Sequence, residues 1–223
     1  GMVLVKVWNS LVSPGTELGG WGQLAAKRET PAEKCDPTPF GYSNAGEVLA
    51  VGEGVTRFAP GQRVACIGAG YAQHTDYAVV PHNLCFALPD NVTFEQGSYA
   101  MLAATGLQAV RRLEPQLGEF AAVLGLGIVG QLTAQLLQIA GVDVIGWDTL
   151  PARLDIARTW GIEQTVNPRE SDPVQASCDF TSGAGLDAAV LAFGGEATDA
   201  YQQAISALKV SPDEHTMGRI VVV

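Results

Sequence analysis

The sequence has few basic residues and no long apolar run. Its 223 residues include 13 Lys and Arg against 23 Asp and Glu, which gives a formal net charge of −10. Nucleic-acid binding depends on clustered Lys and Arg, so this acidic chain is not expected to bind nucleic acid. No apolar stretch reaches the roughly 18 to 20 residues that span a bilayer, and residues 2–7 lack the basic and then apolar pattern of a secretory signal. These absences predict a cytoplasmic protein with no membrane partner.

Cysteine is sparse, and histidine is rarer still. The four cysteines are scattered, without a C-x-x-C pair or a recognisable metal-ligand pattern: Cys35, Cys66, Cys85 and Cys178. They are predicted to be reduced, mostly structural thiols, with an activated redox or nucleophilic cysteine as the alternative. The histidines are isolated in sequence and are expected at structural or surface positions: His74, His82 and His215.

What the chain does have is short apolar runs, and hydrophobic residues make up 47% of it, enough to bury a core. In the first part, apolar runs at residues 3–7, 46–52, 62–67 and 75–80 are separated by turn signals. Turns between short apolar runs are typical of β-structure. The pattern therefore predicts an all-β barrel or sandwich domain over residues 1–92.

The pattern changes near Thr93, where a helical run at 94–102 leads into a second at 107–113. From Phe120, apolar strands at 120–124, 142–147, 164–167, 186–193 and 219–223 alternate with helices at 128–140, 152–160 and 196–208. This alternation is typical of a parallel sheet covered by helices on both faces. Residues 93–223 are therefore predicted to form a doubly wound α/β domain, in which the polar segment 167–185 receives no predicted element.

One glycine-rich motif carries the chemistry of this second domain. It reads Gly125-Leu126-Gly127-Ile128-Val129-Gly130, follows an expected strand and opens an expected helix. In a dinucleotide-binding turn, the first glycine permits the tight turn, the second lets the backbone approach a pyrophosphate, and the third lets helix and strand pack closely. The N-terminus of the helix also attracts phosphates. We therefore expect Gly125, Gly127, Ile128, Val129 and Gly130 to bind a dinucleotide.

Asp148 follows the next strand, about twenty positions beyond the first glycine of the motif, where a carboxylate bonds the adenosine ribose hydroxyls. A carboxylate there repels a 2′-phosphate, which favours NAD(H) over NADP(H). Arg153 is the alternative, as a ligand of a 2′-phosphate, although its spacing suggests a helix surface. The other interpretation is that the glycines only form a tight turn and bind nothing.

Several further segments make the chain resemble the medium-chain dehydrogenase/reductase superfamily, which includes the zinc-type alcohol dehydrogenases. The segments are Gly15-Thr16-Glu17, residues 41–48 with Val51-Gly52, residues 58–64, Ala104-Thr105-Gly106 and residues 125–130. The resemblance implies a GroES-like β barrel over residues 1–92, a Rossmann domain over residues 93–223 and an active site between them. Compared with the family, the chain is short at both ends. The resemblance also implies a homodimer.

The zinc-dependent branch of that family has a cysteine, a histidine and an acidic or cysteine ligand at three positions that here hold Pro14, Tyr42 and Met101. These side chains do not supply the thiolate, imidazole and carboxylate groups that catalytic zinc requires. Only Cys66 stands where the four-cysteine structural zinc lobe is expected. The departure predicts a protein without zinc at either site.

Without zinc, hydroxyl groups are the candidates for polarising a substrate. By family position, Thr16 is expected to relay a proton, and Tyr42 to donate a hydrogen bond from the place that the zinc ligand vacates, with Ser43 and Tyr71 as further candidates. The alternative is that Thr16 only caps a turn and Tyr42 only fills the space left by the metal. Thr105 matches a residue beside the nicotinamide, with helix capping as its alternative role. Trp21, in a glycine-rich loop, is a candidate for lining a flat substrate.

These observations favour a zinc-independent, NAD(H)-dependent oxidoreductase that moves hydride between the nicotinamide and a small-molecule carbonyl, alcohol or activated alkene. An NADPH-dependent quinone or enone reductase is the first alternative. A catalytically silent dinucleotide-binding protein, acting as a sensor or partner subunit, is the second.

Overall fold

The computed structural model describes residues 1–18 and 40–223, so Trp21 and Cys35 lie outside the described residues. The chain divides into two compact units, Gly1–Met101 and Leu102–Val223. The division expected from the sequence, between residues 92 and 93, falls inside the first of these units. Within the part of the chain that is described, no helix has both the length and the apolar character needed to cross a membrane.

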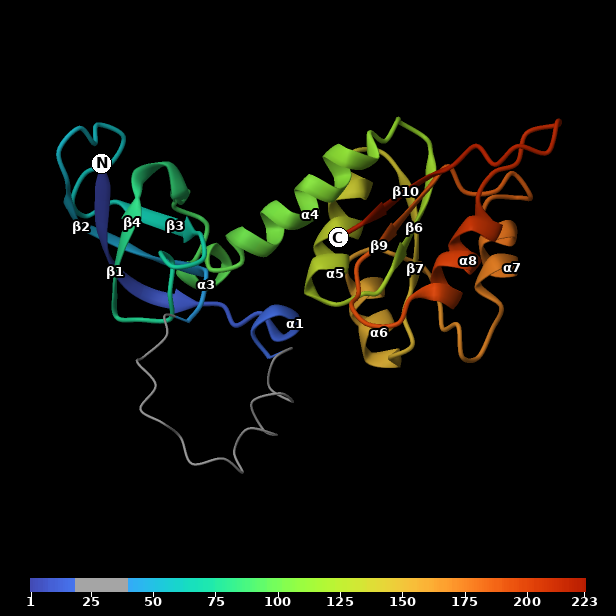
Figure 1. The fold of residues 1–223 in the computed structure, drawn as a ribbon, viewed down its shortest axis with the longest axis horizontal. Coiled ribbons are helices and arrows are strands. Elements are labelled where there is room, and N and C mark those ends of the chain that lie inside the picture. Colours follow the sequence, from blue (N-terminus) through green and yellow to red (C-terminus); the bar gives the residue numbers. More distant parts are fainter. Residues whose placement is uncertain (19–39) are drawn as a thin grey trace, which may run out of the picture. The chain divides into compact units, whose positions relative to one another are not determined.

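The first unit is built on a five-stranded antiparallel sheet with strand order β4-β1-β2-β3-β5 (Figure 1). The predicted all-β architecture is therefore confirmed in this part of the chain. Its elements are β1 (Met2–Ser10), α1 (Pro14–Glu17), β2 (Ser43–Val51), β3 (Arg63–Ile67), β4 (Tyr77–Pro81), the 3-10 helix η1 (His82–Leu84), β5 (Cys85–Ala87) and α3 (Phe94–Gly97).

Alternating side chains build the core of the first unit. Val3 and Val5 of β1 are fully buried and pack with Val48, Val64 and Val80 from the neighbouring strands. Successive strand residues point to opposite faces, so an apolar residue at every second position faces one core.

The first predicted helical run, at residues 94–102, is interrupted in the structure. Thr93 caps α3, because its hydroxyl accepts from the Gln96 N–H while the Gln96 side chain accepts from the Thr93 N–H. This capping box starts a helix of one turn. A separate helix, α4 (Ala100–Leu113), then begins, and most of it belongs to the second unit.

The second unit is a five-stranded sheet with order β10-β9-β6-β7-β8, in which every pair is parallel. The predicted doubly wound α/β fold is confirmed. After α4, its elements are β6 (Phe120–Leu124), α5 (Ile128–Ile139), β7 (Asp143–Trp147), α6 (Pro151–Thr159), β8 (Gln164–Val166), α7 (Pro173–Phe180), β9 (Ala188–Leu191), α8 (Thr198–Ala207) and β10 (Arg219–Val222).

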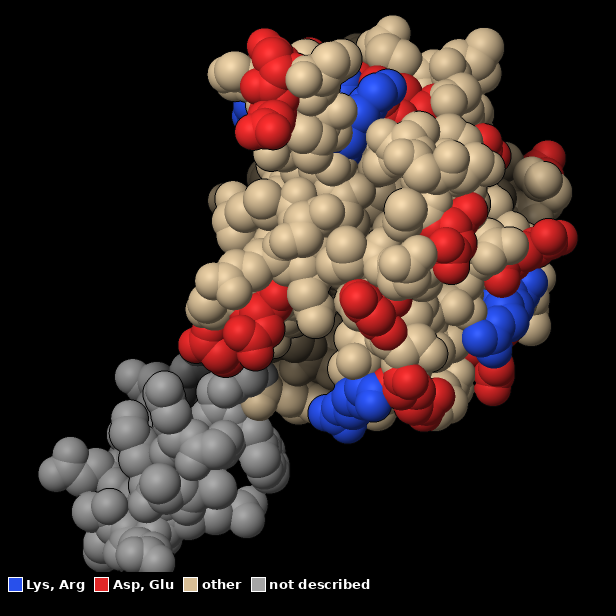
Figure 2. Space-filling view, turned by 90° about the vertical axis from the view of Figure 1, so that its right-hand side faces the viewer, with Lys and Arg blue, Asp and Glu red and all other residues tan. Residues whose placement is uncertain are grey.

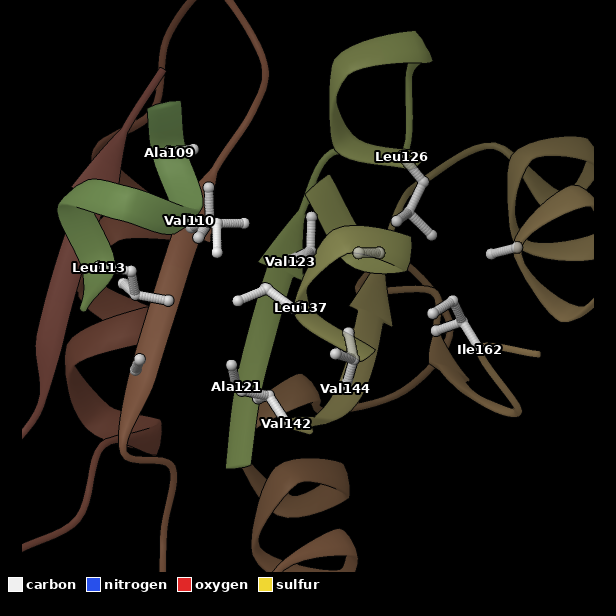
Figure 3. Packing of buried hydrophobic residues seen from close by; sticks show 14 of the residues in the cluster. Ala109, Val110, Leu113, Ala121, Val123, Leu126, Leu137, Val142, Val144 and Ile162 are labelled. Carbon is white, nitrogen blue, oxygen red and sulfur yellow. The ribbon is translucent and has the colours of Figure 1, made fainter. Parts of the chain in front are cut away.

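Helices cover both faces of this sheet (Figure 1). On one face, residues of α4, α5 and α6 pack on the strands; Figure 3 shows Leu137 of α5 close to Val123 of β6. On the other face, residues of α7 and α8 pack against Leu124, Trp147 and Leu191. Burial on two faces explains why β6 and β9 are apolar at almost every position instead of at alternate ones.

Helix α7 lies within the polar segment 167–185, for which the sequence analysis predicted no element. Asp172 caps this helix by accepting from the Val174 N–H at 2.9 Å, and Pro173 occupies its first position. An Asp followed by Pro is a helix-start signal. The helix has only eight residues, too few for a clear helical period, so the cap was the available sequence signal.

Candidate dinucleotide site

The glycine-rich turn joins the end of β6 to the start of α5. Gly125 has φ +87°, a left-handed conformation that favours glycine. A Cβ on Gly130 would lie 1.8 Å from the Gly125 carbonyl oxygen, so only glycine permits this close approach of helix and turn. A Cβ on Gly127 would meet no atom within 4 Å. The first and third glycines thus serve the fold, and the second leaves space for a ligand.

Helix α5 presents its N-terminus at this turn. Gly127 is the N-cap residue and has no side chain to satisfy the first N–H groups, and the first helical hydrogen bond runs from the Gln131 N–H to the Gly127 carbonyl at 2.8 Å. The start of a helix carries a partial positive charge and unpaired amide donors. The amides of Ile128 and Val129 therefore belong to an arrangement that suits a phosphate group.

Asp148 follows β7 directly, and its carboxylate is buried, with a side-chain exposure of 4%. One oxygen, Oδ2, accepts from the Leu126 N–H at 2.7 Å, and Oδ1 accepts from the Leu150 N–H at 2.8 Å. Each carboxylate oxygen has about two acceptor positions, and Oδ2 also accepts from Arg153 Nη1 at 3.4 Å, so Oδ1 is the oxygen that retains capacity for a ligand hydroxyl. Asp148 thus fixes the glycine-rich turn through Oδ2 and offers an acceptor to a ribose at Oδ1.

A cavity of about 520 Å³ lies at the carboxyl ends of the parallel strands. It is lined by residues that end or follow four strands: Leu124 and Gly125 after β6, Trp147, Asp148 and Thr149 after β7, Pro168 and Arg169 after β8, and Phe193 after β9, together with Arg153, Glu196, Asp199, Ala200 and Gln203. The strand order reverses between β6 and β9, and open α/β sheets bind ligands beside such a reversal. The cavity is therefore placed where the fold favours a ligand.

Two arginines and three carboxylates give this cavity its charge. Arg153 lies 3.4 Å from Asp148 Oδ2 with a half-exposed side chain, and Arg169 lines the same cavity. At the rim, hydrogen bonds from the Thr198 side chain and main chain hold the pKa of Glu196 below its usual value. Figure 2 shows Asp and Glu spread over one face of the molecule with few Lys and Arg among them. In so acidic a chain, two arginines at one cavity are a local exception.

The structure brings together only some of the residues predicted for the site. Gly125 and Asp148 line one cavity, whereas Gly127 to Gly130 continue the same turn into the start of α5 and are not among the residues that line it. Thr105 lies in the middle of α4, so the capping role considered for it is wrong. Thr16 on α1 and Tyr42 before β2 belong to the first unit, where Thr16 is exposed and Tyr42 is partly buried.

Ser43 has a structural role in the first unit. Its hydroxyl is buried, donates to the Ser98 carbonyl at 2.6 Å and accepts from the Met101 N–H at 3.3 Å. Tyr71, the other hydroxyl candidate, is 44% exposed. Ser43 therefore ties β2 to the start of α4, which makes it a weaker candidate for contact with a substrate.

Residues 1–18 and 40–223 contain no group of three or more His, Cys, Asp and Glu side chains placed to hold a metal ion. His74 instead pairs with Glu17, at 3.0 Å between Nε2 and Oε2. Cys66 and Cys85 face each other across β3 and β5, with their sulfur atoms 3.8 Å apart.

Several residues of the cavity were not predicted from the sequence. Pro168 and Arg169 follow β8, and Phe193 follows β9. The rule that ligands bind at the carboxyl ends of parallel strands points to these positions once the strands are known. Glu196 and Gln203 reach the cavity because of the way α8 packs on the sheet, and the sequence pattern does not reveal that packing.

Comparison with known protein families places this arrangement in context. Residues 3–90 match the model of the alcohol dehydrogenase GroES-like domain, and residues 129–223 match that of the zinc-binding dehydrogenases. Together the two models match most of the chain, and in the order expected for one family.

Individual relatives agree with these matches. The chain is 30% identical over 177 residues to (R,R)-butanediol dehydrogenase of Bacillus subtilis, covering 69% of this chain and 51% of that protein. It is 30% identical over 150 residues to a quinone oxidoreductase of Pseudomonas aeruginosa, covering 66% and 46% respectively. The chain thus spans about half the length of the curated relatives it matches.

A solved structure supports the fold across the whole chain. An alcohol dehydrogenase superfamily protein from Novosphingobium aromaticivorans has a TM-score of 0.81 at 24% identity, covering 100% of this chain and 64% of that one. With its β domain, its parallel-sheet unit and its glycine-rich turn, the chain belongs to the medium-chain dehydrogenase/reductase superfamily.

Proposed function

We propose that the protein is an NAD(H)-dependent oxidoreductase that transfers hydride without zinc. The observation that carries the proposal is the buried Asp148 carboxylate, which lines the same cavity as Gly125. A cavity with a glycine-rich turn and a ribose acceptor fits a dinucleotide, and Gly127 leaves the space that a pyrophosphate needs. When bound, the nicotinamide supplies the hydride chemistry, and the chain supplies binding and orientation.

NAD(H) is the favoured cofactor because a carboxylate at the ribose repels a 2′-phosphate. A specific observation favours the alternative, an NADPH-dependent quinone or enone reductase: Arg153 and Arg169 also line the cavity. However, Arg153 lies beside Asp148, and its positive charge is already partly balanced by that carboxylate. A 2′-phosphate has to compete with Asp148 for the same guanidinium, so the balance favours the unphosphorylated cofactor.

The proposal of zinc independence rests on the residues at the family's ligand positions. Pro14, Tyr42 and Met101 stand there, and Pro and Met offer neither a thiolate nor an imidazole nor a carboxylate. We assign polarisation of a carbonyl, alcohol or activated alkene to hydroxyl groups instead, with Thr16 relaying a proton and Tyr42 donating a hydrogen bond. Thr105 is proposed to lie beside the nicotinamide.

The test is titration with NADH and with NADPH, followed by nicotinamide fluorescence. The wild type is expected to bind NADH about tenfold more tightly than NADPH, which corresponds to ~1.4 kcal/mol. Asp148→Asn is expected to narrow or reverse this ratio. The matched control is Asp155→Asn, which removes the same charge from an exposed position on α6. Tighter binding of NADPH by the wild type would favour the alternative reductase.

A second measurement separates an active enzyme from a silent binding protein. Oxidation of NADH is followed with a panel of quinones, enones and ketones, and the metal content of the same sample is measured. Thr16→Val and Tyr42→Phe are expected to lower kcat while leaving the affinity for NADH unchanged, because both residues lie in the first unit. NADH binding without turnover on any acceptor would support the silent dinucleotide-binding protein.

A further inference from the structure

Three side chains of the first unit are linked in a row by hydrogen bonds, and none of them belongs to the dinucleotide site. Ser10 Oγ lies 2.9 Å from His74 Nδ1, and His74 Nε2 lies 3.0 Å from Glu17 Oε2. Ser10 ends β1, Glu17 ends α1 and His74 lies just before β4. The fold therefore brings together a hydroxyl, an imidazole and a carboxylate that are far apart in sequence.

The carboxylate fixes which imidazole nitrogen carries the proton. The Glu17 side chain is 4% exposed, and its Oε1 has no hydrogen-bond partner among the described residues. An ionised carboxylate only accepts hydrogen bonds, so Nε2 of His74 must donate to it. In the neutral ring Nδ1 is then the acceptor, and the Ser10 hydroxyl donates to it. This is the relation between nucleophile, base and orienting acid that activates a serine.

The imidazole is also held in place from outside this chain of bonds. The main-chain N–H of His74 donates to the Phe40 carbonyl at 2.8 Å, and the Phe40 ring centre lies 5.4 Å from that of the imidazole. Gly41 has φ +99°, and a Cβ there would approach the imidazole Cδ2 to 2.8 Å. Only glycine permits this contact, so the backbone at Gly41 packs directly on the ring and restricts its rotation.

Ser10 opens onto a hollow of about 600 Å³. Its lining consists of Val7, Trp8, Ser10, His74, Thr75 and Asp76. A register shift between Val7 and Asn9 marks a bulge in β1 directly before Ser10. Bulges often re-aim side chains next to active sites. The Ser10 residue is exposed, whereas the Glu17 carboxylate behind the imidazole is buried, so the hydroxyl is the accessible end of the chain of bonds.

From this geometry we propose that Ser10 is a base-activated nucleophile that accepts the acyl group of activated esters of small carboxylic acids. The Ser10 oxygen attacks the ester carbonyl while His74 Nδ1 takes the hydroxyl proton. The bond from the carbonyl carbon to the leaving oxygen then breaks, and His74 returns the proton to the leaving group. The product is an ester of Ser10, which water cleaves with His74 again as base. No electrons are transferred, so the reaction is independent of the dinucleotide.

The experiment treats the full chain with p-nitrophenyl acetate. Release of p-nitrophenolate is followed by absorbance, and the acetylated peptide is identified by mass spectrometry. We expect one acetyl group per chain, on the peptide that contains Ser10, and no such adduct in Ser10→Ala. His74→Gln and Glu17→Gln are each expected to slow acetylation of Ser10 by about tenfold or more. His215→Gln, which changes an exposed histidine bonded within its own loop, is the matched control and should react like the wild type.

Circular dichroism of each variant establishes that it is folded. If His74→Gln does not fold, Glu17→Gln provides the same test, because it keeps the shape of the side chain while removing its charge. Acetylation only at lysines or the N-terminus would overturn the proposal, as would an unchanged rate at Ser10 in the folded variants. The three side chains would then serve as a structural tie between α1 and the sheet.

Discussion

The two units of this protein position their polar side chains in different ways. In the parallel-sheet unit, Gly125, Asp148, Arg169 and Phe193 each follow the end of a strand, so the topology alone brings them to one edge. In the antiparallel unit, Ser10, Glu17 and His74 lie on β1, α1 and the approach to β4, and specific hydrogen bonds bring them together. The first arrangement follows from the fold class, and the second depends on individual side chains.

The largest expected effect comes from the third glycine of the turn. In Gly130→Ala the new Cβ would lie 1.8 Å from the Gly125 carbonyl, so α5 has to move away from β6. We expect a loss of more than about 3 kcal/mol in the free energy of unfolding, measured by urea unfolding and circular dichroism, together with loss of NADH binding.

Gly127→Ala is the matched control for that variant. Its Cβ would meet no protein atom within 4 Å, so the expected loss of stability is below about 1 kcal/mol. NADH affinity should nevertheless fall by about tenfold or more, because the methyl group occupies space assigned to the pyrophosphate. Unchanged NADH binding in Gly127→Ala would contradict that assignment.

A glycine in the other unit tests whether the two units are independent. Gly46→Ala would place a Cβ 2.0 Å from the Lys6 carbonyl and separate β1 from β2. The unfolding transition of the first unit is expected to lose about 2 to 3 kcal/mol. NADH affinity, measured by fluorescence, should stay the same because the cavity residues all belong to the second unit. Loss of NADH binding would show that the units are thermodynamically coupled.

Substitution of Arg63 is expected to lower the stability of the first unit by a smaller amount. Its guanidinium donates to the carbonyls of Pro89, Asp90 and Val92 and lies 4.7 Å from the centre of the Phe94 ring. Arg63→Met removes these bonds and should lower the melting temperature, by an amount equivalent to about 1 to 2 kcal/mol. Arg63→Lys keeps the charge but loses the planar fork, so it should recover only part of the loss. Full recovery by lysine would mean that charge alone matters there.

The last prediction concerns the reactivity of the cysteines and involves no change in stability. A hydrogen bond to the Cys85 sulfur, together with burial, raises the pKa of the Cys66 thiol far above its usual value, whereas Cys178 is exposed. Because the thiolate is the reactive form, iodoacetamide near neutral pH should modify Cys178 well before Cys66. Peptide mapping after a short exposure checks this order, and rapid modification of Cys66 in the folded protein would contradict the structure.

The comparison also explains what could be predicted from the sequence. Apolar strands buried on both faces carry a strong signal, so β6, β7, β9 and the turn at Gly125 were predicted correctly. Helix α7 was missed because its one clear signal is the cap at Asp172. The partners of His74 are 57 and 64 positions away. No local pattern reveals such pairs, and the sequence analysis therefore treated His74 as isolated.

The most direct test of the account is to map the NADH site residue by residue. Amide chemical shifts of the isotope-labelled chain are recorded by NMR during titration with NADH. The largest changes are expected at Gly125, Gly127, Ile128, Val129 and Thr149, the positions that adjoin the turn and Asp148. Changes confined to the antiparallel unit, or no changes at the turn when NADH is in excess, would contradict the assignment of the dinucleotide site.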